Sequence, residues 1–337
     1  MKNVTLKDVA KAAGVSYATV SRSLSGNSQI SSETRERVLK ICDEMGYTTN
    51  FVARSMVTKR TNLIGLVVPS VDNPFMSELA YHAEVSARAH GYNIMLCDSG
   101  PDLKQEKTVF KLLLGRQVDG ILIVPQSSRS YDHLKAYLDQ VPTVFLSENL
   151  RDQPQSYVAV DNSRGTYLGT RYLYELGHRD ILYFAQRRST THQLRAEGYQ
   201  KACQELGLTP RFFNSDYSRS SIQGGYELAK KLFRKPLDYT AVFAATDSNA
   251  LGMLTAADEL GIDIPGQLSL IGFDNISATA LSRIDLTTVD QPKRDMAVQA
   301  VDMLRDKIEH GTQGYVHQIL LPTLIQRGTC RELKPAR

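Results

Sequence analysis

The sequence lacks the features that mark several classes of protein. Its cysteines are scattered, and no pair has the spacing of a metal site or a redox motif, so we expect core or incidental thiols and no bound metal. The four are Cys42, Cys97, Cys203 and Cys330. No apolar run reaches the length of a membrane-spanning helix, and the N-terminus has no apolar signal segment. These absences predict a cytoplasmic chain without membrane contact.

Patterns typical of enzymes are absent as well. The sequence contains no GxSxG, no HExxH and no phosphate-binding P-loop, and its seven histidines are dispersed. The glycines of residues 161–170 lack the spacing of a dinucleotide-binding loop, which argues against a nicotinamide cofactor. We therefore expect neither catalysis nor a cofactor.

Charge is distributed unevenly along the chain. Residues 1–60 contain ten lysines and arginines but five aspartates and glutamates, a net charge of +5, whereas the whole chain carries +4. A basic N-terminal segment on a nearly neutral remainder indicates a DNA-binding unit, because phosphate contacts require clustered positive charge.

Residues 5–24, TLKDVAKAAGVSYATVSRSL, predict two short helices joined by a tight turn. Thr5 and Ser16 are suitable N-caps. Gly14 can end the first helix, because glycine adopts the left-handed conformation without steric cost. This arrangement predicts a helix-turn-helix.

The second helix of this pair should present one exposed face. That face carries an aromatic ring, a methyl group, a hydroxyl and a guanidinium, from Tyr17, Ala18, Ser21 and Arg22. Such side chains suit the base edges in a DNA major groove. A helical hairpin of an ordinary domain, with Arg22 simply solvated, is the alternative interpretation of the pattern alone.

Residues 31–46 predict a third helix, capped by Ser31 or Ser32 and ended by Gly46. Its apolar positions, which should close a small three-helix core, are Val38, Leu39, Cys42 and Met45. A unit of this size is near the lower limit of independent stability.

From Leu63 onward, short apolar strands alternate with amphipathic helices. The expected strands are 63–69, 92–98, 120–125, 143–146, 181–185, 241–245 and 269–272, with a last strand at 317–326. The expected helices are 75–90, 103–116, 164–176, 195–206, 248–260 and 293–309. This alternation predicts an α/β fold with parallel sheets, in two arrays that meet near 160–162 and again near 289–292.

Several motifs follow one another in a specific order: TLKDVAKAAGVSYATVSRSLSG, NFVAR (50–54), VDNPF (71–75), VDNSRG (160–165), LGHRDI (176–181), LSLIGFDN (268–275) and LTTVDQP (286–292). On these motifs the whole chain resembles the lactose-repressor/galactose-repressor (LacI/GalR) family of bacterial regulators. The resemblance implies a helix-turn-helix domain at 1–46, a hinge at 47–60 and, at 61–337, a two-lobed core similar to periplasmic sugar-binding proteins. Lobe 1 would comprise about 61–160 and 292–316, and lobe 2 about 161–289 and 317–330.

The resemblance also implies which residues contact DNA. They are Thr5, Leu6, Ser16, Tyr17, Ala18, Thr19, Ser21, Arg22, Gln29, Ser31, Thr34, Tyr47, Asn50, Ala53 and Met56. In the hinge, Thr49 stands where the family usually has proline, and Met56 stands at the position of an apolar wedge that is usually leucine. A plain linker is the alternative interpretation of residues 47–60.

Ligands of such sheets bind beyond the carboxyl ends of the strands, so the residues there are candidates for an effector site. They are Ser70, Asp72, Asn73, Phe75, Gln126, Glu148, Arg195, Tyr217, Asp247, Asp274 and Gln291. Arg195 matches the RxxGY motif of the family, and Thr246 replaces the usual asparagine before Asp247. A turn or a helix cap is the alternative role of Asp72 and Asp274. We expect Arg195 and Asp274 to bind sugar hydroxyls and, if the cleft between the lobes is wet, to be dispensable for folding.

These observations together predict a homodimeric transcriptional regulator, a repressor, that binds double-stranded operator DNA under the control of a sugar. One alternative keeps the regulator but makes the ligand a purine or a phosphorylated metabolite that acts as co-repressor. A solute-binding protein is a second alternative, against which the helix-turn-helix and the missing signal segment argue. The expected location is the cytoplasm, at the nucleoid.

Overall fold

The computed structural model describes residues 4–24, 29–47, 60–100, 102–127, 129–150, 153–186, 190–215, 221–234 and 236–333. The chain forms two compact units, one ending at Thr61 and the other beginning at Asn62.

The first unit contains the predicted helix-turn-helix. Thr5 caps its first helix, and Gly14 ends that helix in the left-handed conformation with a φ of 65°. The backbone N–H of Thr19 donates to the Ser16 hydroxyl over 3.0 Å, so Ser16 caps the second helix. The three helices are α1 (Leu6–Ala13), α2 (Tyr17–Leu24) and α3 (Ser32–Glu44).

A small apolar core joins these three helices. Its buried members are Val9, Ala10, Ala13, Val20, Val38 and Cys42. The prediction that Leu39 belongs to this core is wrong, because its side chain is 45% exposed. Ile41 packs against the core instead, together with Met45. The helical repeat places positions 38, 41, 42 and 45 on one face of α3 and turns position 39 away from it.

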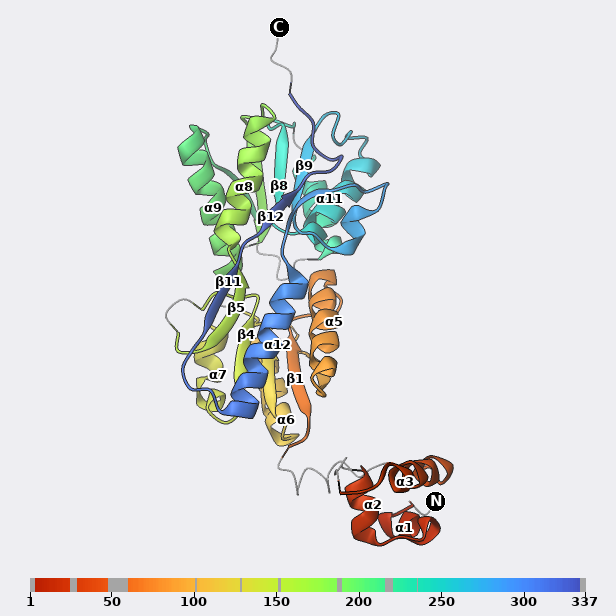
Figure 1. The fold of residues 1–337 in the computed structure, drawn as a ribbon. Helices are drawn as coiled ribbons and strands as arrows, with labels where there is room; N and C mark the ends of the chain where they lie inside the picture. The colour runs from red at the N-terminus through yellow and green to blue at the C-terminus, as the bar shows by residue number, and fades with distance from the viewer. Residues whose placement is uncertain are drawn as a thin grey trace. The chain divides into compact units, whose positions relative to one another are not determined.

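The second unit consists of two lobes, each built on a six-stranded sheet (Figure 1). The first sheet has the spatial order β11 (His317–Leu320), β5 (Ser156–Val160), β4 (Thr143–Leu146), β3 (Gly120–Ile123), β1 (Leu63–Val68) and β2 (Asn93–Asp98), and all its pairs are parallel.

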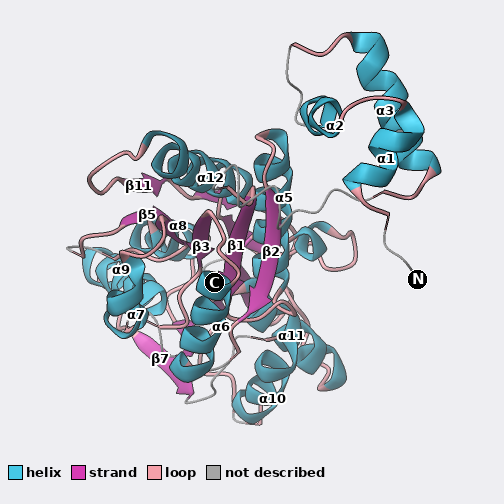
Figure 2. Ribbon diagram, turned by 90° about the horizontal axis from the view of Figure 1, so that it is seen from below, coloured by secondary structure: helices cyan, strands magenta, loops and turns pink. Residues whose placement is uncertain are grey.

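Helices cover both faces of this first sheet (Figure 2). The helices α5 (Pro74–Ala89) and α12 (Lys293–His310) lie side by side on one face and share one apolar core with it. The helices α6 (Leu103–Gly115) and α7 (Ser130–Leu138) pack on the other face. Because both faces are covered, the four central strands β1, β3, β4 and β5 are almost entirely buried, as is typical of parallel sheets.

The second lobe repeats this architecture. Its sheet has the order β12 (Thr323–Ile325), β10 (Thr287–Asp290), β9 (Ser269–Asp274), β8 (Ala241–Ala244), β6 (Ile181–Gln186) and β7 (Arg211–Ser215), and only the β10–β12 pair is antiparallel. The helices α10 (Ile222–Leu232) and α11 (Asp247–Glu259) cover one face, and α8 (Asn162–Glu175) and α9 (Thr190–Leu206) cover the other. A short 3₁₀ helix, η1 (Ser277–Ala280), follows β9.

The chain passes between the lobes three times, from β5 to α8, from β10 to α12 and from β11 to β12. The prediction of one strand at 317–326 in the second lobe is wrong in its first half, because β11 pairs with β5 in the first sheet. Pro322 lies between the two short strands. Proline lacks the N–H that a strand ladder needs, so the strand is interrupted there. The predicted α/β fold class, with a helical N-terminal unit and two parallel-sheet lobes, is confirmed.

Candidate DNA-binding face and effector site

The second helix of the helix-turn-helix keeps its predicted outer face free of the core. Tyr17, Ala18, Ser21 and Arg22 are all exposed, and Tyr17 has 54% of its surface accessible. Val20 and Ser23 are the buried residues of this helix. The face therefore carries a ring, a methyl group, a hydroxyl and a guanidinium at the positions that the sequence predicts.

Several predicted DNA contacts are helix caps in this structure. Thr5 and Asp8 form a capping box, in which the Thr5 backbone N–H donates to the Asp8 carboxylate over 2.9 Å. The Ser31 hydroxyl caps α3 through the Thr34 backbone N–H over 3.3 Å, and it donates to the Thr34 hydroxyl over 2.9 Å. Capping and phosphate contact are compatible, because both use polar groups at a helix N-terminus.

The remaining predicted DNA contacts are less uniform. Gln29 is exposed, whereas Leu6 and Tyr47 are half-buried and pack against the helical core. The predicted hinge contacts Asn50, Ala53 and Met56 lie outside the described residues.

In the second lobe, Arg195 is the centre of a buried polar cluster. Its side chain is 3% exposed. Its Nε donates to Asn162 over 2.8 Å, Nη1 donates to the Ala245 carbonyl over 2.5 Å, and Nη2 donates to Asp274 over 3.3 Å. The guanidinium also lies 3.7 Å from the centre of the Phe273 ring. These contacts hold Arg195 in one orientation beyond the carboxyl ends of β8 and β9.

Asp274 ends β9 and completes this cluster. Its Oδ1 accepts from Arg195 and also from the Gln291 amide over 2.7 Å. Burial raises the pKa of this carboxyl, while Arg195 lowers it. The structure thus brings three of the predicted effector residues, Arg195, Asp274 and Gln291, into one cluster, in which they bind one another.

Asp247 lies next to this cluster but uses its carboxylate within the lobe. As the first residue of α11, it accepts from the Thr288 hydroxyl over 2.5 Å and from the Ile276 backbone N–H over 2.9 Å. Burial raises the pKa of Asp247 to about 7, and the nearby Asp274 carboxylate acts in the same direction. Thr246 caps α11 by accepting from the Asn249 N–H over 3.2 Å.

The predicted effector residues after β1 have mainly local partners. The Ser70 hydroxyl donates to the exposed Asp72 carboxylate, and the Asn73 side chain caps α5 by accepting from the Phe75 N–H over 2.9 Å. The Phe75 ring is 4% exposed and belongs to the core of the first lobe. Asn73 therefore has the role of a helix cap, and Asp72 that of a turn residue.

Two further predicted residues follow β3 and β4. The Gln126 backbone N–H donates to the buried Glu106 carboxylate over 2.8 Å. Glu148 is buried, and its Oε2 accepts from the Thr191 hydroxyl of α9 over 2.7 Å, so this contact links the two lobes. Tyr217 lies outside the described residues.

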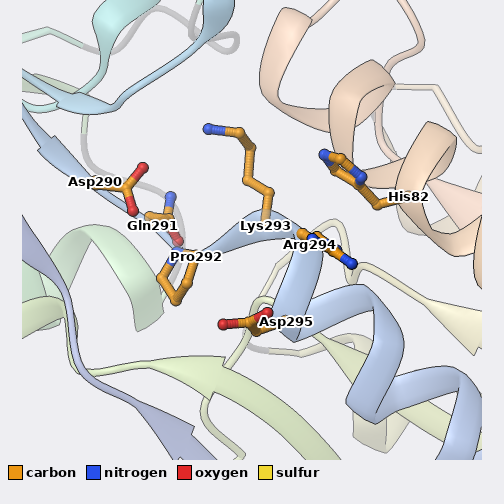
Figure 3. A pocket seen from close by; sticks show the side chains of 7 residues that line it. All are labelled: His82, Asp290, Gln291, Pro292, Lys293, Arg294 and Asp295. Carbon is orange, nitrogen blue, oxygen red and sulfur yellow. The ribbon is translucent and has the colours of Figure 1, made fainter.

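A pocket of about 230 Å³ lies at the passage from β10 to α12 (Figure 3). It is lined by His82, Asp290, Gln291, Pro292, Lys293, Arg294 and Asp295. Gln291 is the member of the predicted effector set that lines it. The pocket therefore adjoins the Arg195–Asp274 cluster through Gln291 without being lined by that pair.

Sequence reasoning missed three residues that hold this region together. Asn162 binds Arg195, and Lys293 and Glu78 contact the turn that follows Asp274. Asn162 and Lys293 each had a signal, since Asn162 lies in the VDNSRG motif and Lys293 directly follows the LTTVDQP motif. Glu78 had none, because its partners are distant in the sequence.

In the part of the chain that the structure describes, no helix is both long and apolar enough to cross a membrane. The same residues contain no group of three metal-ligating side chains able to hold an ion. A helix-turn-helix with an exposed polar face, joined to a two-lobed core with polar clusters at strand ends, defines a ligand-responsive DNA-binding protein.

Comparisons with known proteins agree with this class. Residues 5–50 match the family described as bacterial regulatory proteins, lacI family, and residues 170–330 match a periplasmic binding protein-like domain. The HTH-type transcriptional regulator DegA of Bacillus subtilis (strain 168) is 36% identical over 300 residues, 88% of each chain.

Solved structures extend the comparison to the fold. The lac repressor dimer bound to operator and the anti-inducer ONPF superposes with a TM-score of 0.86 and 28% identity, over 98% of this chain and 100% of that one. The complex of the regulator CelR with cellobiose gives a TM-score of 0.70 and 28% identity, over 97% and 100%. The chain belongs to the lacI family, and it is a DNA-binding transcriptional regulator with a ligand-binding core.

Proposed function

We propose that this regulator binds one sugar between its lobes, at the cluster formed by Arg195, Asp274 and Gln291. The observation that carries this proposal is the buried pairing of a forked donor with a carboxylate beyond the carboxyl ends of the second-lobe strands. Neighbouring hydroxyls of a sugar can accept from one such group and donate to the other. The cellobiose complex of CelR supports a sugar as the class of ligand.

Two buried amide oxygens add to this argument. The side-chain oxygens of Gln126 and Gln291 are buried and have no hydrogen-bond partner within the described residues. A buried acceptor without a donor is costly, so such groups call for an explanation. Hydroxyl donors of a bound sugar would satisfy both oxygens, one from each lobe.

The proposed DNA complex contains two heads. Exposed apolar side chains lie on α5 and on the edge strand β2 of the first lobe, at Tyr81, Val85 and Leu96. We assign them to a homodimer interface, which two-fold operators require. The α2 face would read bases in the major groove, and Ala53 and Met56 would enter the minor groove. The regulator would act in the cytoplasm, at the nucleoid, as a repressor of transcription.

Ligand and operator would act on each other through linkage. A sugar that binds more tightly to one arrangement of the lobes shifts the population toward that arrangement and so changes operator affinity. By reciprocity, operator DNA must change sugar affinity by the same factor.

A thermal-shift screen tests the ligand. The panel contains cellobiose and other sugars, sugar phosphates, and free purines, because a specific ligand raises the melting temperature by mass action. We expect a sugar to stabilise the wild type and to lose most of its effect on the Asp274→Asn variant. Asp258→Asn, at an exposed acid of α11 that does not line the pocket, is the control and should respond normally. A response to a purine or a sugar phosphate alone would replace the sugar with that co-repressor class.

A further inference from the structure

The turn after β9 has an unfavourable backbone. Asp274 and Asn275 are consecutive non-glycine residues with φ values of 123° and 49°. Positive φ is uncommon for residues that carry a side chain and persists where surrounding contacts impose it. This backbone aims the Asp274 carboxylate at Arg195 and Gln291, so whatever holds the turn also positions the proposed effector site.

Lys293 holds the turn by donating hydrogen bonds to the backbone carbonyl groups of the turn. It is the first residue of α12 and is 8% exposed, and Figure 3 shows its side chain extending from the start of that helix. Its Nζ donates to the Asp274 carbonyl over 2.8 Å and to the Asn275 carbonyl over 2.7 Å. An ammonium offers three donors and no acceptor, which suits two adjacent carbonyl oxygens and one carboxylate.

Glu78 completes the contact from the first lobe. It lies on α5, and its Oε1 accepts from the Ser277 backbone N–H over 2.7 Å. Its Oε2 lies 3.5 Å from Lys293 Nζ, longer than either carbonyl bond of that lysine. The turn of the second lobe is thus held by two side chains from helices that pack in the core of the first lobe.

We propose that Lys293 and Glu78 are positioning residues of the effector site, which fix the turn at residues 274–277 and couple it to α5. The proposal rests on the assignment of Arg195 and Asp274 as the ligand cluster. A ligand that displaces Asp274 must move the carbonyl groups that Lys293 binds and the N–H that Glu78 binds. The movement of the turn is therefore transmitted to α5, which carries the exposed apolar residue Tyr81.

Hydrogen exchange of the full-length protein without added ligand tests this coupling. Lys293→Met keeps the length of the side chain but removes the donors, and we expect exchange at Ile276 and Ser277 to become about tenfold faster. Lys293→Arg retains donors for the carbonyls and should restore most of the protection. Glu78→Gln should speed exchange at Ser277 by about threefold, since its amide oxygen still accepts but carries no charge. Arg294→Met, at the exposed neighbour, should change nothing.

A charge exchange separates positioning from simple ion pairing. The double variant Glu78→Lys with Lys293→Glu restores the ion pair, but glutamate cannot donate to the two carbonyl groups. We expect no recovery of protection in the turn. Recovery would show that only the ion pair matters and would overturn the proposal.

The resonance of the Arg195 Nε–H group provides a second readout, assigned with Arg195→Lys. It should shift in Lys293→Met and stay in place in Arg294→Met, because Nη2 of the same guanidinium binds Asp274, whose position changes only in the first variant. Unchanged exchange and an unchanged resonance in Lys293→Met would refute the proposal, as would uniformly faster exchange over the whole second lobe. Since no ligand is added, failure of the sugar assignment would leave these results intact and would be recognised separately.

Discussion

The helical head and the second lobe use their predicted contact residues in opposite ways. In the head, Tyr17 and Arg22 stand exposed on a helix whose packing relies on other positions. In the second lobe, Arg195 and Asp274 are buried and bound to each other. The proposed base contacts are therefore separable from folding, whereas the proposed ligand cluster is also part of the fold.

Among the variants that test this difference, Arg195→Ala should have the largest effect on stability. The expectation that this residue is dispensable for folding conflicts with its burial, because removal leaves Asp274 with one donor fewer and leaves Asn162 and Ala245 without the donors that now reach them. Breaking a buried charged pair costs about 3–5 kcal/mol. Urea unfolding of the full chain should show a loss of this size. A variant as stable as the wild type would mean that the site tolerates water and that the pair is not structural.

The matching change in the head is Arg22→Ala. Its side chain is exposed, so stability should change by less than about 0.5 kcal/mol. Selection of binding sites from a random DNA library should show relaxed preference at one base pair in each half-site, worth about 1–3 kcal/mol of discrimination. Arg37→Ala, an exposed arginine of α3, is the control and should keep the preference. A uniform loss of affinity for all sequences in Arg22→Ala would identify a phosphate contact.

Features that depend on residues close together in the sequence could be predicted, whereas features that depend on distant residues could not. Thr5, Gly14 and Ser16 act through neighbours within four residues, so the head could be predicted from its sequence. Asn73 also acts locally, and its capping role competes with the ligand role that its position after a strand implied. The break of the predicted strand 317–326 into two strands also had a local signal, because Pro322 lies within it.

Burial in the core depends on contacts that no local pattern reports. Phe75 follows a strand end, where a ligand contact is reasonable, yet α12 and the first sheet enclose its ring. Glu78 binds Ser277 from 199 residues away, so its role became visible only in three dimensions. Position along a strand thus predicted the location of the buried polar cluster but not which hydrogen bonds its members make.

A change of pH sharpens the contrast, because the second lobe contains a carboxyl with a raised pKa. The folded-state pKa of Asp247, about 7, lies above the ordinary value, so the native state binds this proton more tightly than the unfolded chain. The resulting stability is complete below about pH 4 and is lost as pH rises to about 7. Asp247→Asn should therefore flatten the stability profile in this window, by at most about 1.4 kcal/mol per pH unit. Urea unfolding at each pH measures the difference between variant and wild type, with Asp295→Asn as a control that should leave the slope unchanged. An identical slope in Asp247→Asn would mean that this carboxyl is ionised throughout.

The smallest expected change in stability is that of a substitution at Leu39, in the helical head. Its side chain is 45% exposed, so Leu39→Ala removes little buried surface and should change stability by less than about 0.5 kcal/mol. Val38, its neighbour on α3, is fully buried, and Val38→Ala should destabilise the head several-fold more, because a three-helix core of this size has little surplus stability. Hydrogen exchange of the α3 amides in the full chain would separate the two variants. Equal effects would mean that Leu39 is covered in solution by a surface that the head alone does not supply.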